Sequence, residues 1–101
     1  MDKWLNMIMI CKKAGRLILG FDAVKKNILN GKVKMVLLTQ DVSENTKKEA
    51  LFVCENSSIK CYSVPYTMEH TEFYLSKKSA VLGVADEGFS VSIENLIKHS
   101  F

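Results

Sequence analysis

The sequence of 101 residues has little proline, little cysteine and no long hydrophobic run. Pro65 is its one proline and only five residues are glycine, so no linker rich in these residues divides it, and we expect one domain over residues 1–101. The apolar stretches fall short of the roughly 20 residues that a membrane-spanning helix needs, so we expect no membrane partner. A chain of this length can bury roughly 65% of the surface of its unfolded form, which is enough for one core.

The three cysteines, Cys11, Cys54 and Cys61, indicate reduced thiols rather than a disulfide framework. Their number is odd, no pair has C-x-x-C spacing, and each lies in an apolar stretch. No small-residue cleavage site follows the N-terminal residues 1–13, so we expect a cytoplasmic protein. His70 could complete a zinc set with Cys54 and Cys61, but this spacing is a weak signal. We therefore expect neither a metal nor a cofactor.

Enzyme signatures are also missing from the chain. It has no G-x-G-x-x-G, no P-loop, no G-x-S-x-G and no H-E-x-x-H. Its two histidines, His70 and His99, are far apart, and their positions are typical of surface or helix-end residues. We therefore expect a protein without catalytic residues.

Alternating helices and strands are predicted from the apolar spacing and the turn residues. Helices are expected over Asp2–Lys13, Gly20–Gly31, Ser43–Asn56, Met68–Leu75 and from Gly88 onwards, and strands over Arg16–Leu19, Val33–Leu38, Ile59–Val64 and Ala80–Ala85. The first helix is expected to bury the face formed by Trp4, Ile8 and Cys11, and the fourth to turn Thr71, Tyr74 and Leu75 inwards. The apolar run Val33–Leu38 is typical of a central strand, and Ser43 is a good N-cap for the helix that follows it. The second helix is expected to turn an apolar stripe towards the core, made of Phe21, Val24, Ile28 and Leu29. This order predicts an α/β protein, a three-layer α/β/α sandwich with alternating helices and strands around a four-stranded mixed sheet.

Basic residues gather around the turns of this predicted fold. The net charge of +3 is too small to hold nucleic acid unless the positive groups cluster. The candidates are Lys12, Lys13, Arg16, Lys25, Lys26, Lys77 and Lys78. In an alternating sandwich their loops can meet at one end, next to a helix N-terminus that attracts phosphate and to Gly20, which lets a backbone approach closely. These groups therefore suggest an RNA-binding surface.

Each part of this surface also has a purely structural interpretation. Asp22 and Lys26 are four residues apart on one helix, so they could pair on a solvated face. Lys77 and Lys78 could form an ordinary polar turn.

Four segments of the chain carry a resemblance to a known family. They are KAGRLILG at Lys13–Gly20, the interval Gly20–Gly31, NGKVKMVLLTQDVSENTKKE at Asn30–Glu49 and AVLGVADEGFS at Ala80–Ser90. Together they resemble the kink-turn-binding ribosomal protein superfamily of the L-seven-Ae and L-thirty-e type, most closely its small bacterial YlxQ-like branch. The resemblance covers nearly the whole chain. It implies an α/β/α sandwich that binds a sharply bent RNA with tandem sheared G·A pairs and has no catalysis of its own.

The resemblance also implies roles for residues of the second helix. In the family, the helix that begins at the position of Gly20 enters the widened groove at the G·A pairs, and an Asn, a Glu and a Lys contact guanine edges and phosphates. By register these positions are Asp22, Ala23 and Lys26. Lys26 keeps the cation that can reach the O6 and N7 atoms of a guanine. Ala23 has no polar side chain and Asp22 repels phosphate, so we expect weaker or altered kink-turn specificity.

Two other segments complete the surface that the resemblance implies. Gln40 precedes Asp41 after the second strand, where a side chain can contact a base or ribose. In the family, the loop before the last strand covers an extruded nucleotide, and in this chain that loop is formed by Lys77, Lys78 and Ser79. The RNA-binding residues that we expect are Lys13, Arg16, Gly20, Asp22, Lys25, Lys26, Gln40, Lys77, Lys78 and Ser79.

The expected partner is a structured RNA, either ribosomal or another kink-turn RNA, with ribosomal proteins as further partners and no DNA. The departures at Asp22 and Ala23 leave one alternative open. In that alternative the protein is an interaction adaptor that keeps the fold but has lost specific RNA readout.

Overall fold

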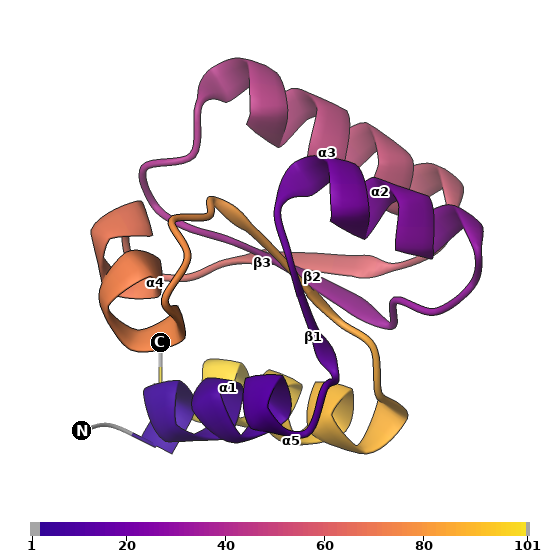
Figure 1. Ribbon diagram of the computed structural model, residues 1–101. Helices are drawn as coiled ribbons and strands as arrows, with labels where there is room; N and C mark the ends of the chain where they lie inside the picture. The colour runs from indigo at the N-terminus through magenta and orange to yellow at the C-terminus, as the bar shows by residue number, and fades with distance from the viewer. Residues whose placement is uncertain (1–2, 101) are drawn as a thin grey trace.

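Five helices and four strands make up the described part of the chain (Figure 1). The computed structural model describes residues 3–100. The helices are α1 (Lys3–Lys13), α2 (Phe21–Leu29), α3 (Glu44–Asn56), α4 (Met68–Leu75) and α5 (Glu87–Ser100), and the strands are β1 (Leu17–Leu19), β2 (Met35–Leu38), β3 (Lys60–Ser63) and β4 (Val81–Val84). The observed bounds lie within two residues of the predicted ones, and Asp2 lies outside the described residues. None of the described helices is long and apolar enough to cross a membrane.

The strands form one mixed sheet with the order β1-β4-β2-β3. Strand β2 is parallel to β3, whereas β4 is antiparallel to both β1 and β2. Every residue of the two central strands, β2 and β4, is buried, which explains their nearly continuous apolar sequences. The prediction of a four-stranded mixed sheet is therefore confirmed.

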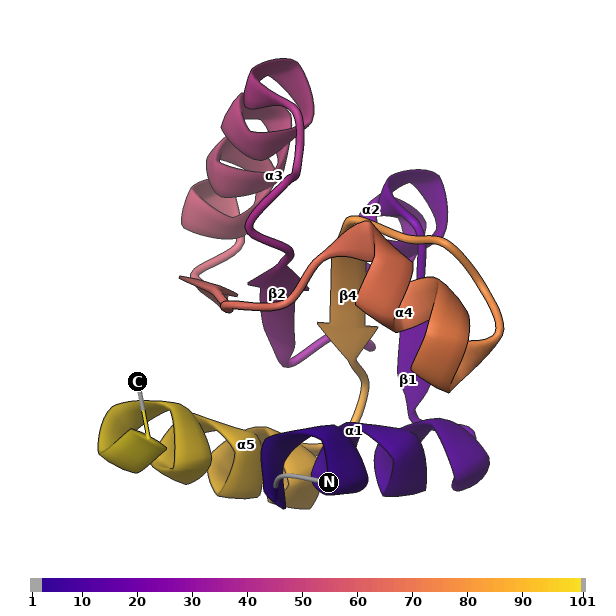
Figure 2. The ribbon, with the colours of Figure 1, turned by 90° about the vertical axis from the view of Figure 1, so that its left-hand side faces the viewer.

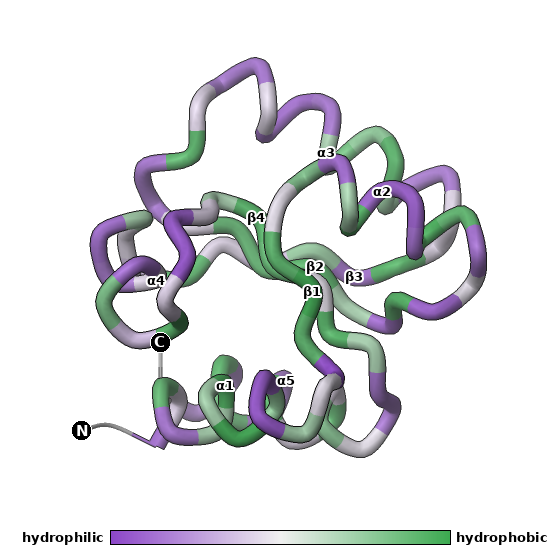
Figure 3. The backbone as a smooth tube through the Cα atoms, viewed as in Figure 1, coloured by the Kyte–Doolittle hydropathy of each residue, from purple (hydrophilic) through white to green (hydrophobic). Residues whose placement is uncertain are grey.

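Helices cover both faces of the sheet (Figure 1, Figure 2). Helices α2 and α3 lie on one face, α1 and α5 on the other, and α4 lies beside α1. Hydrophobic residues concentrate in the strands, and hydrophilic residues concentrate in the loops and the outer helix surfaces (Figure 3). This arrangement confirms the predicted three-layer α/β/α sandwich.

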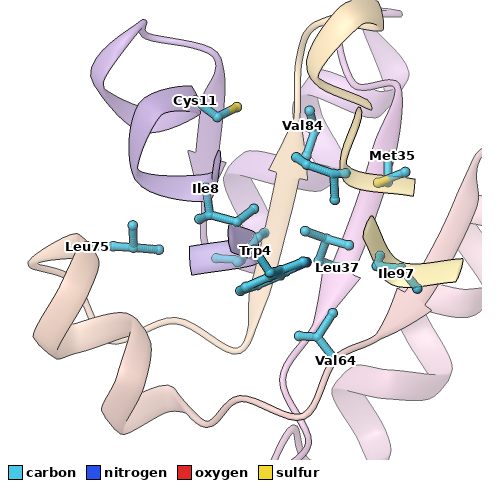
Figure 4. Close-up of a cluster of buried hydrophobic side chains, with 11 residues drawn as sticks. Trp4, Ile8, Cys11, Met35, Leu37, Val64, Leu75, Val84 and Ile97 are labelled. Carbon is cyan, nitrogen blue, oxygen red and sulfur yellow. The ribbon is translucent and has the colours of Figure 1, made fainter. Parts of the chain in front are cut away.

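Two hydrophobic clusters hold the layers together, one on each face of the sheet. Because successive strand side chains point to opposite faces, Met35 and Leu37 join the α1 side and Val36 joins the α2 side. The buried members of the α1-side cluster are Trp4, Ile8, Cys11, Met35, Leu37, Val64, Leu75, Leu82, Val84, Ile93 and Ile97 (Figure 4). The predicted face of the first helix, Trp4, Ile8 and Cys11, is therefore buried as expected.

Side chains cap the N-termini of three helices, with Ser43 before α3, Thr67 before α4 and Asp86 before α5. The Ser43 hydroxyl accepts a hydrogen bond from the Thr46 N–H at 3.2 Å, as its N-cap position predicted. At the start of α4, the Thr67 hydroxyl accepts from the His70 N–H, and His70 Nδ1 accepts from the Thr67 N–H at 3.0 Å. His70 is therefore a helix-end residue, as predicted.

The cysteines are free thiols, with Cys11 and Cys54 buried and Cys61 half-buried. Burial, together with the nearby Asp86 carboxylate, raises the pKa of the Cys11 thiol to about 11. Cys11 is therefore neutral and unreactive at physiological pH.

Candidate nucleic-acid interface

Three segments that are distant in sequence meet at the end of the sheet where α2 begins, which we call the α2 end. The Gly20 N–H donates to the Val81 carbonyl at 3.0 Å, and the Thr39 N–H donates to the Ala80 carbonyl at 3.0 Å. Figure 2 shows the start of α2, the tip of β2 and the start of β4 at this end. Since β2 and β4 are antiparallel, the residues that leave one strand lie beside those that enter the other.

The N-terminus of α2 is open to an anion. Gly20 has a φ of 100°, a conformation that favours glycine, and no side chain caps the helix. The Cβ atom that any other residue would carry at this position would lie 3.9 Å from the Lys77 ammonium nitrogen. The helix dipole and Lys77 therefore place positive potential at the same point.

The exposed face of α2 forms a shallow groove that runs along the helix from its first turn to its last. Its lining residues are Asp22, Lys25, Lys26, Leu29 and Asn30. Among residues 3–100, ion pairs form only at Glu94, with Lys60 and Lys98, so the alternative in which Asp22 pairs with Lys26 is not observed. Lys25 and Lys26 are therefore exposed cations without a carboxylate partner in the described structure.

The solvent exposure of Leu29 differs from what we expected from the sequence. We expected it to face the core with Val24 and Ile28, but 73% of its surface is exposed, whereas those two residues are buried. Leu29 lies three residues after Lys26 and seven after Asp22, a spacing that places all three on one face of the helix. The same spacing is the signal that would have assigned Leu29 to the groove.

Gln40 is exposed at the end of β2, and its neighbours hold its backbone in place. The Gln40 N–H donates to the Tyr66 carbonyl at 2.9 Å. The Asp41 carboxylate accepts from the Met68 N–H at 3.0 and 3.3 Å, and so satisfies a donor at the start of α4. The Gln40 side chain can therefore reach a ligand from a fixed position.

The loop before β4 presents two lysines and buries its serine. Lys77 and Lys78 are exposed, whereas Ser79 is only 5% exposed. The Ser79 hydroxyl donates to the Val81 carbonyl at 2.8 Å, and the Thr71 hydroxyl bonds to both the N–H and the carbonyl of Ser79. Ser79 thus shapes the loop from inside the protein. Sequence reasoning missed this role of Thr71, although its inward-facing position in α4 was a signal.

Lys13 and Arg16 lie at the opposite end of the sheet. The Arg16 carbonyl accepts from the Ala85 N–H at 2.8 Å, beyond the last residue of β4, whereas Gly20 lies beside Val81 at the start of that strand. The expectation that all the basic turns meet at one end is therefore wrong for Lys13 and Arg16. The reason is that β1 separates Arg16 from Gly20, so the residues at its two ends cannot share one end of the sheet.

A known protein family matches nearly the whole length of this chain. The model of the ribosomal protein L7Ae/L30e/S12e/Gadd45 family matches residues 2–93. The chain belongs to this family. The membership confirms the resemblance that the sequence segments carried.

Two relatives of this chain carry the name RNA-binding protein YlxQ. The one from Enterococcus faecium is 32% identical over 97 residues, which cover 96% of this chain and 93% of the relative. The one from Bacillus subtilis strain 168 is 30% identical over 100 residues, which cover 94% of this chain and 95% of the relative. Neither these names nor the family description denotes an enzyme, in agreement with the expected lack of catalysis.

Solved structures share the fold. A protein of unknown function from Bacillus halodurans C is 30% identical, with a TM-score of 0.90 over 98% of this chain and 100% of its own. A 15.5kD RNA binding protein from Giardia lamblia is 11% identical, with a TM-score of 0.75 over 93% of this chain and 81% of its own. At such low identity the second likeness concerns the fold alone.

Proposed function

We propose that this chain binds structured RNA of the kink-turn type and stabilises its bent conformation without catalysing a reaction. The observation that carries the proposal is the convergence of the open α2 N-terminus, Lys26, Gln40 and the Lys77–Lys78 loop at the α2 end of the sheet. Membership of a ribosomal protein family and two relatives named as RNA-binding proteins support the same ligand class.

The α2 end offers two kinds of contact to RNA. The α2 N-terminus with Lys77 binds a phosphate, because unsatisfied N–H groups and an ammonium both attract it. Lys26, one turn further along the helix, reaches the O6 and N7 acceptors of a guanine edge. The major groove of ordinary A-form RNA is too deep and narrow for this contact, so the protein requires a widened groove.

Stabilisation of the bend follows from this requirement. A protein that binds only the bent conformer shifts the RNA population by its difference in affinity for the two conformers. We propose ribosomal RNA, or another cytoplasmic RNA with a kink-turn, as the natural ligand.

Two residues in the first turn of α2, Asp22 and Ala23, differ from those of the family and change the contacts that the helix can make with bases. Asp22 accepts hydrogen bonds from guanine N1 and N2 but repels phosphate, and Ala23 offers only a methyl group. Among the side chains, phosphate contacts therefore fall to Lys25, Lys77 and Lys78, beside the N–H groups of the α2 N-terminus. We expect the preference for a kink-turn over a duplex to survive in a weakened form.

The test is binding of the purified protein to a fluorescent kink-turn RNA and to a control RNA whose G·A pairs are replaced by Watson–Crick pairs. Lys26→Ala should weaken kink-turn binding by about tenfold, since a good contact to a guanine is worth about 1–3 kcal/mol. Lys48→Ala, which removes an exposed cation from α3, should change it less than about twofold. Equal small effects from both substitutions would exclude the α2 groove as the site.

An interaction adaptor is the second candidate, and exposed aromatic residues favour it. Phe73 on α4 is 77% exposed and Phe52 on α3 is 66% exposed. Phe73 borders a groove with Glu69, Glu72 and Tyr74. This function predicts no discrimination between the two RNAs in the same assay, and the recovery of a ribosomal protein by the immobilised chain.

A further inference from the structure

A second group of basic residues lies at the end of the sheet opposite the α2 end. The Ala85 N–H donates to the Arg16 carbonyl at 2.8 Å, and the Lys34 N–H donates to the Val84 carbonyl at 2.7 Å. Because β4 lies between β1 and β2, Arg16 and Lys34 are separated by two strand spacings, about 10 Å. Residues 16 and 34 therefore flank the end of the same central strand.

The turn after α1 adds two lysines to this group. Gly15, with a φ of 73°, donates its N–H to the Lys12 carbonyl at 2.9 Å, and the Arg16 N–H donates to the Cys11 carbonyl at 3.0 Å. This tight turn ends the helix directly before β1. Lys12 and Lys13 are exposed in the last helical turn, next to Arg16.

The turn after α2 adds one more lysine. The Lys32 N–H donates to the Asn27 carbonyl at 2.9 Å, so the chain folds back against the end of the helix before it enters β2. The Lys34 ammonium donates to the Gly31 carbonyl at 3.3 Å across the same turn. Lys32 and Lys34 are both exposed. We name the five residues together the second basic cluster: Lys12, Lys13, Arg16, Lys32 and Lys34.

The charge of this cluster is not neutralised within the described structure. No ion pair among residues 3–100 involves any of its five members, since the ion pairs found there join Glu94 to Lys60 and Lys98. The carboxylates that follow β4 are those of Asp86 and Glu87, and the Asp86 carboxylate already accepts from the Phe89 N–H at 2.8 Å. The five cations of the cluster therefore have no carboxylate partner among the described residues.

We propose that the second basic cluster binds the phosphate backbone of an RNA stem that continues from the RNA held at the α2 end. This inference rests on the proposed function for the class of ligand. The four residue steps from Arg16 to Gly20 span about 13 Å of extended chain, the length of roughly four to five base pairs of a duplex. One folded RNA can therefore touch both ends of the sheet.

The contact at the cluster is electrostatic. Exposed lysine and arginine side chains neutralise phosphates and release counterions, and such contacts position an RNA without reading its sequence. The α2 end would select the bent RNA, and the second basic cluster would add affinity for any stem that reaches it.

The test compares Arg16→Ala/Lys34→Ala with Lys47→Ala/Lys48→Ala, a pair of substitutions that removes the same charge from α3. Affinity is measured across a salt series for one kink-turn RNA with extended stems and one with short stems. The Arg16/Lys34 pair should reduce the slope of log K against log salt concentration by about 2 on the extended RNA, close to one unit per lost phosphate contact. The short RNA and the control pair should show little change, and circular dichroism melting checks that each variant is folded.

The outcomes separate this proposal from the proposed function. An equal slope change for both pairs of substitutions, or none for either, would overturn the second basic cluster, even if the kink-turn is still preferred over its Watson–Crick control. A selective slope change for the Arg16/Lys34 pair without any kink-turn preference would support the cluster and remove kink-turn recognition. Failure to bind either RNA would overturn both proposals.

Discussion

The contact between β4 and α2 leads to a quantitative prediction for Gly83→Ala. Gly83 is buried in the central strand β4, on the face that α2 covers. A Cβ atom at this position would lie 3.1 and 3.3 Å from the two γ-carbons of Val24 and 3.3 Å from a γ-carbon of Val33. Ordinary carbon–carbon contacts are about 3.5–4.0 Å, so the helix or the strand must move by a few tenths of an ångström.

Two opposing effects set the magnitude for Gly83→Ala. Replacing glycine with alanine reduces the conformational entropy of the unfolded chain and stabilises the fold by about 0.4–1 kcal/mol. Overpacking a close contact costs about 1–3 kcal/mol. Val24 is 1% exposed and is β-branched in a helix, so it has one strongly preferred rotamer and cannot turn away. Overpacking therefore dominates, and we expect a net loss of about 1–2 kcal/mol in the free energy of unfolding.

Urea unfolding of a double-mutant cycle measures this contact directly. Val24→Ala removes the two γ-carbons that the new methyl group meets, so Gly83→Ala should cost about 1 kcal/mol less in the Val24→Ala background than in the wild type. Because Val24 lies between Asp22 and Lys26 on α2, Gly83→Ala alone should also weaken kink-turn binding. Additive free energies in the cycle, or a Gly83→Ala variant more stable than the wild type, would refute the steric explanation.

Two further substitutions test the polar groups of the fold. Thr39 is 1% exposed, and its hydroxyl has no hydrogen-bond partner among the described residues. Thr39→Val should therefore raise the free energy of unfolding by about 1 kcal/mol in urea titrations. A loss of stability would mean that the hydroxyl does form a hydrogen bond in the folded protein. Hydrogen bonds from Lys60 and Tyr62 lower the pKa of Glu94, so its ionised form stabilises the folded state above the ordinary glutamate pKa of about 4.3. Glu94→Gln should therefore lower the melting temperature at neutral pH. The difference in melting temperature between this variant and the wild type should vanish as the pH falls through the lowered pKa of Glu94. A difference that does not depend on pH would contradict stabilisation by the ionised carboxylate.

Local sequence signals were sufficient to predict the elements of the fold. The helical spacing of Trp4, Ile8 and Cys11 predicted the buried face of α1, and the apolar run Val33–Leu38 predicted a central strand. Ser43 predicted the start of α3. These predictions succeed because backbone periodicity and capping act over a few residues, and burial of the apolar side of each element leaves few ways to stack them.

Solvent exposure on α2 was harder to predict than the helix itself. Leu29 follows the apolar residue Ile28, and both fit a broad apolar stripe, yet only Ile28 meets the sheet. The number of α2 residues that the sheet buries depends on how the helix crosses the sheet. A single helix pattern does not contain this information.

The order and types of the residues were enough to specify alternating helices and strands, a basic α2 and the absence of enzyme signatures. Which basic residues act together depended on strand pairing. Arg16 and Lys34 lie at the same end of the sheet because β4, from a distant part of the chain, pairs with both of the strands that they precede. Arg16 and Gly20, by contrast, are separated by the length of β1. Long-range pairing of strands is a property of the whole folded chain, so it divided the basic residues between two ends of the sheet in a way that no local pattern contained.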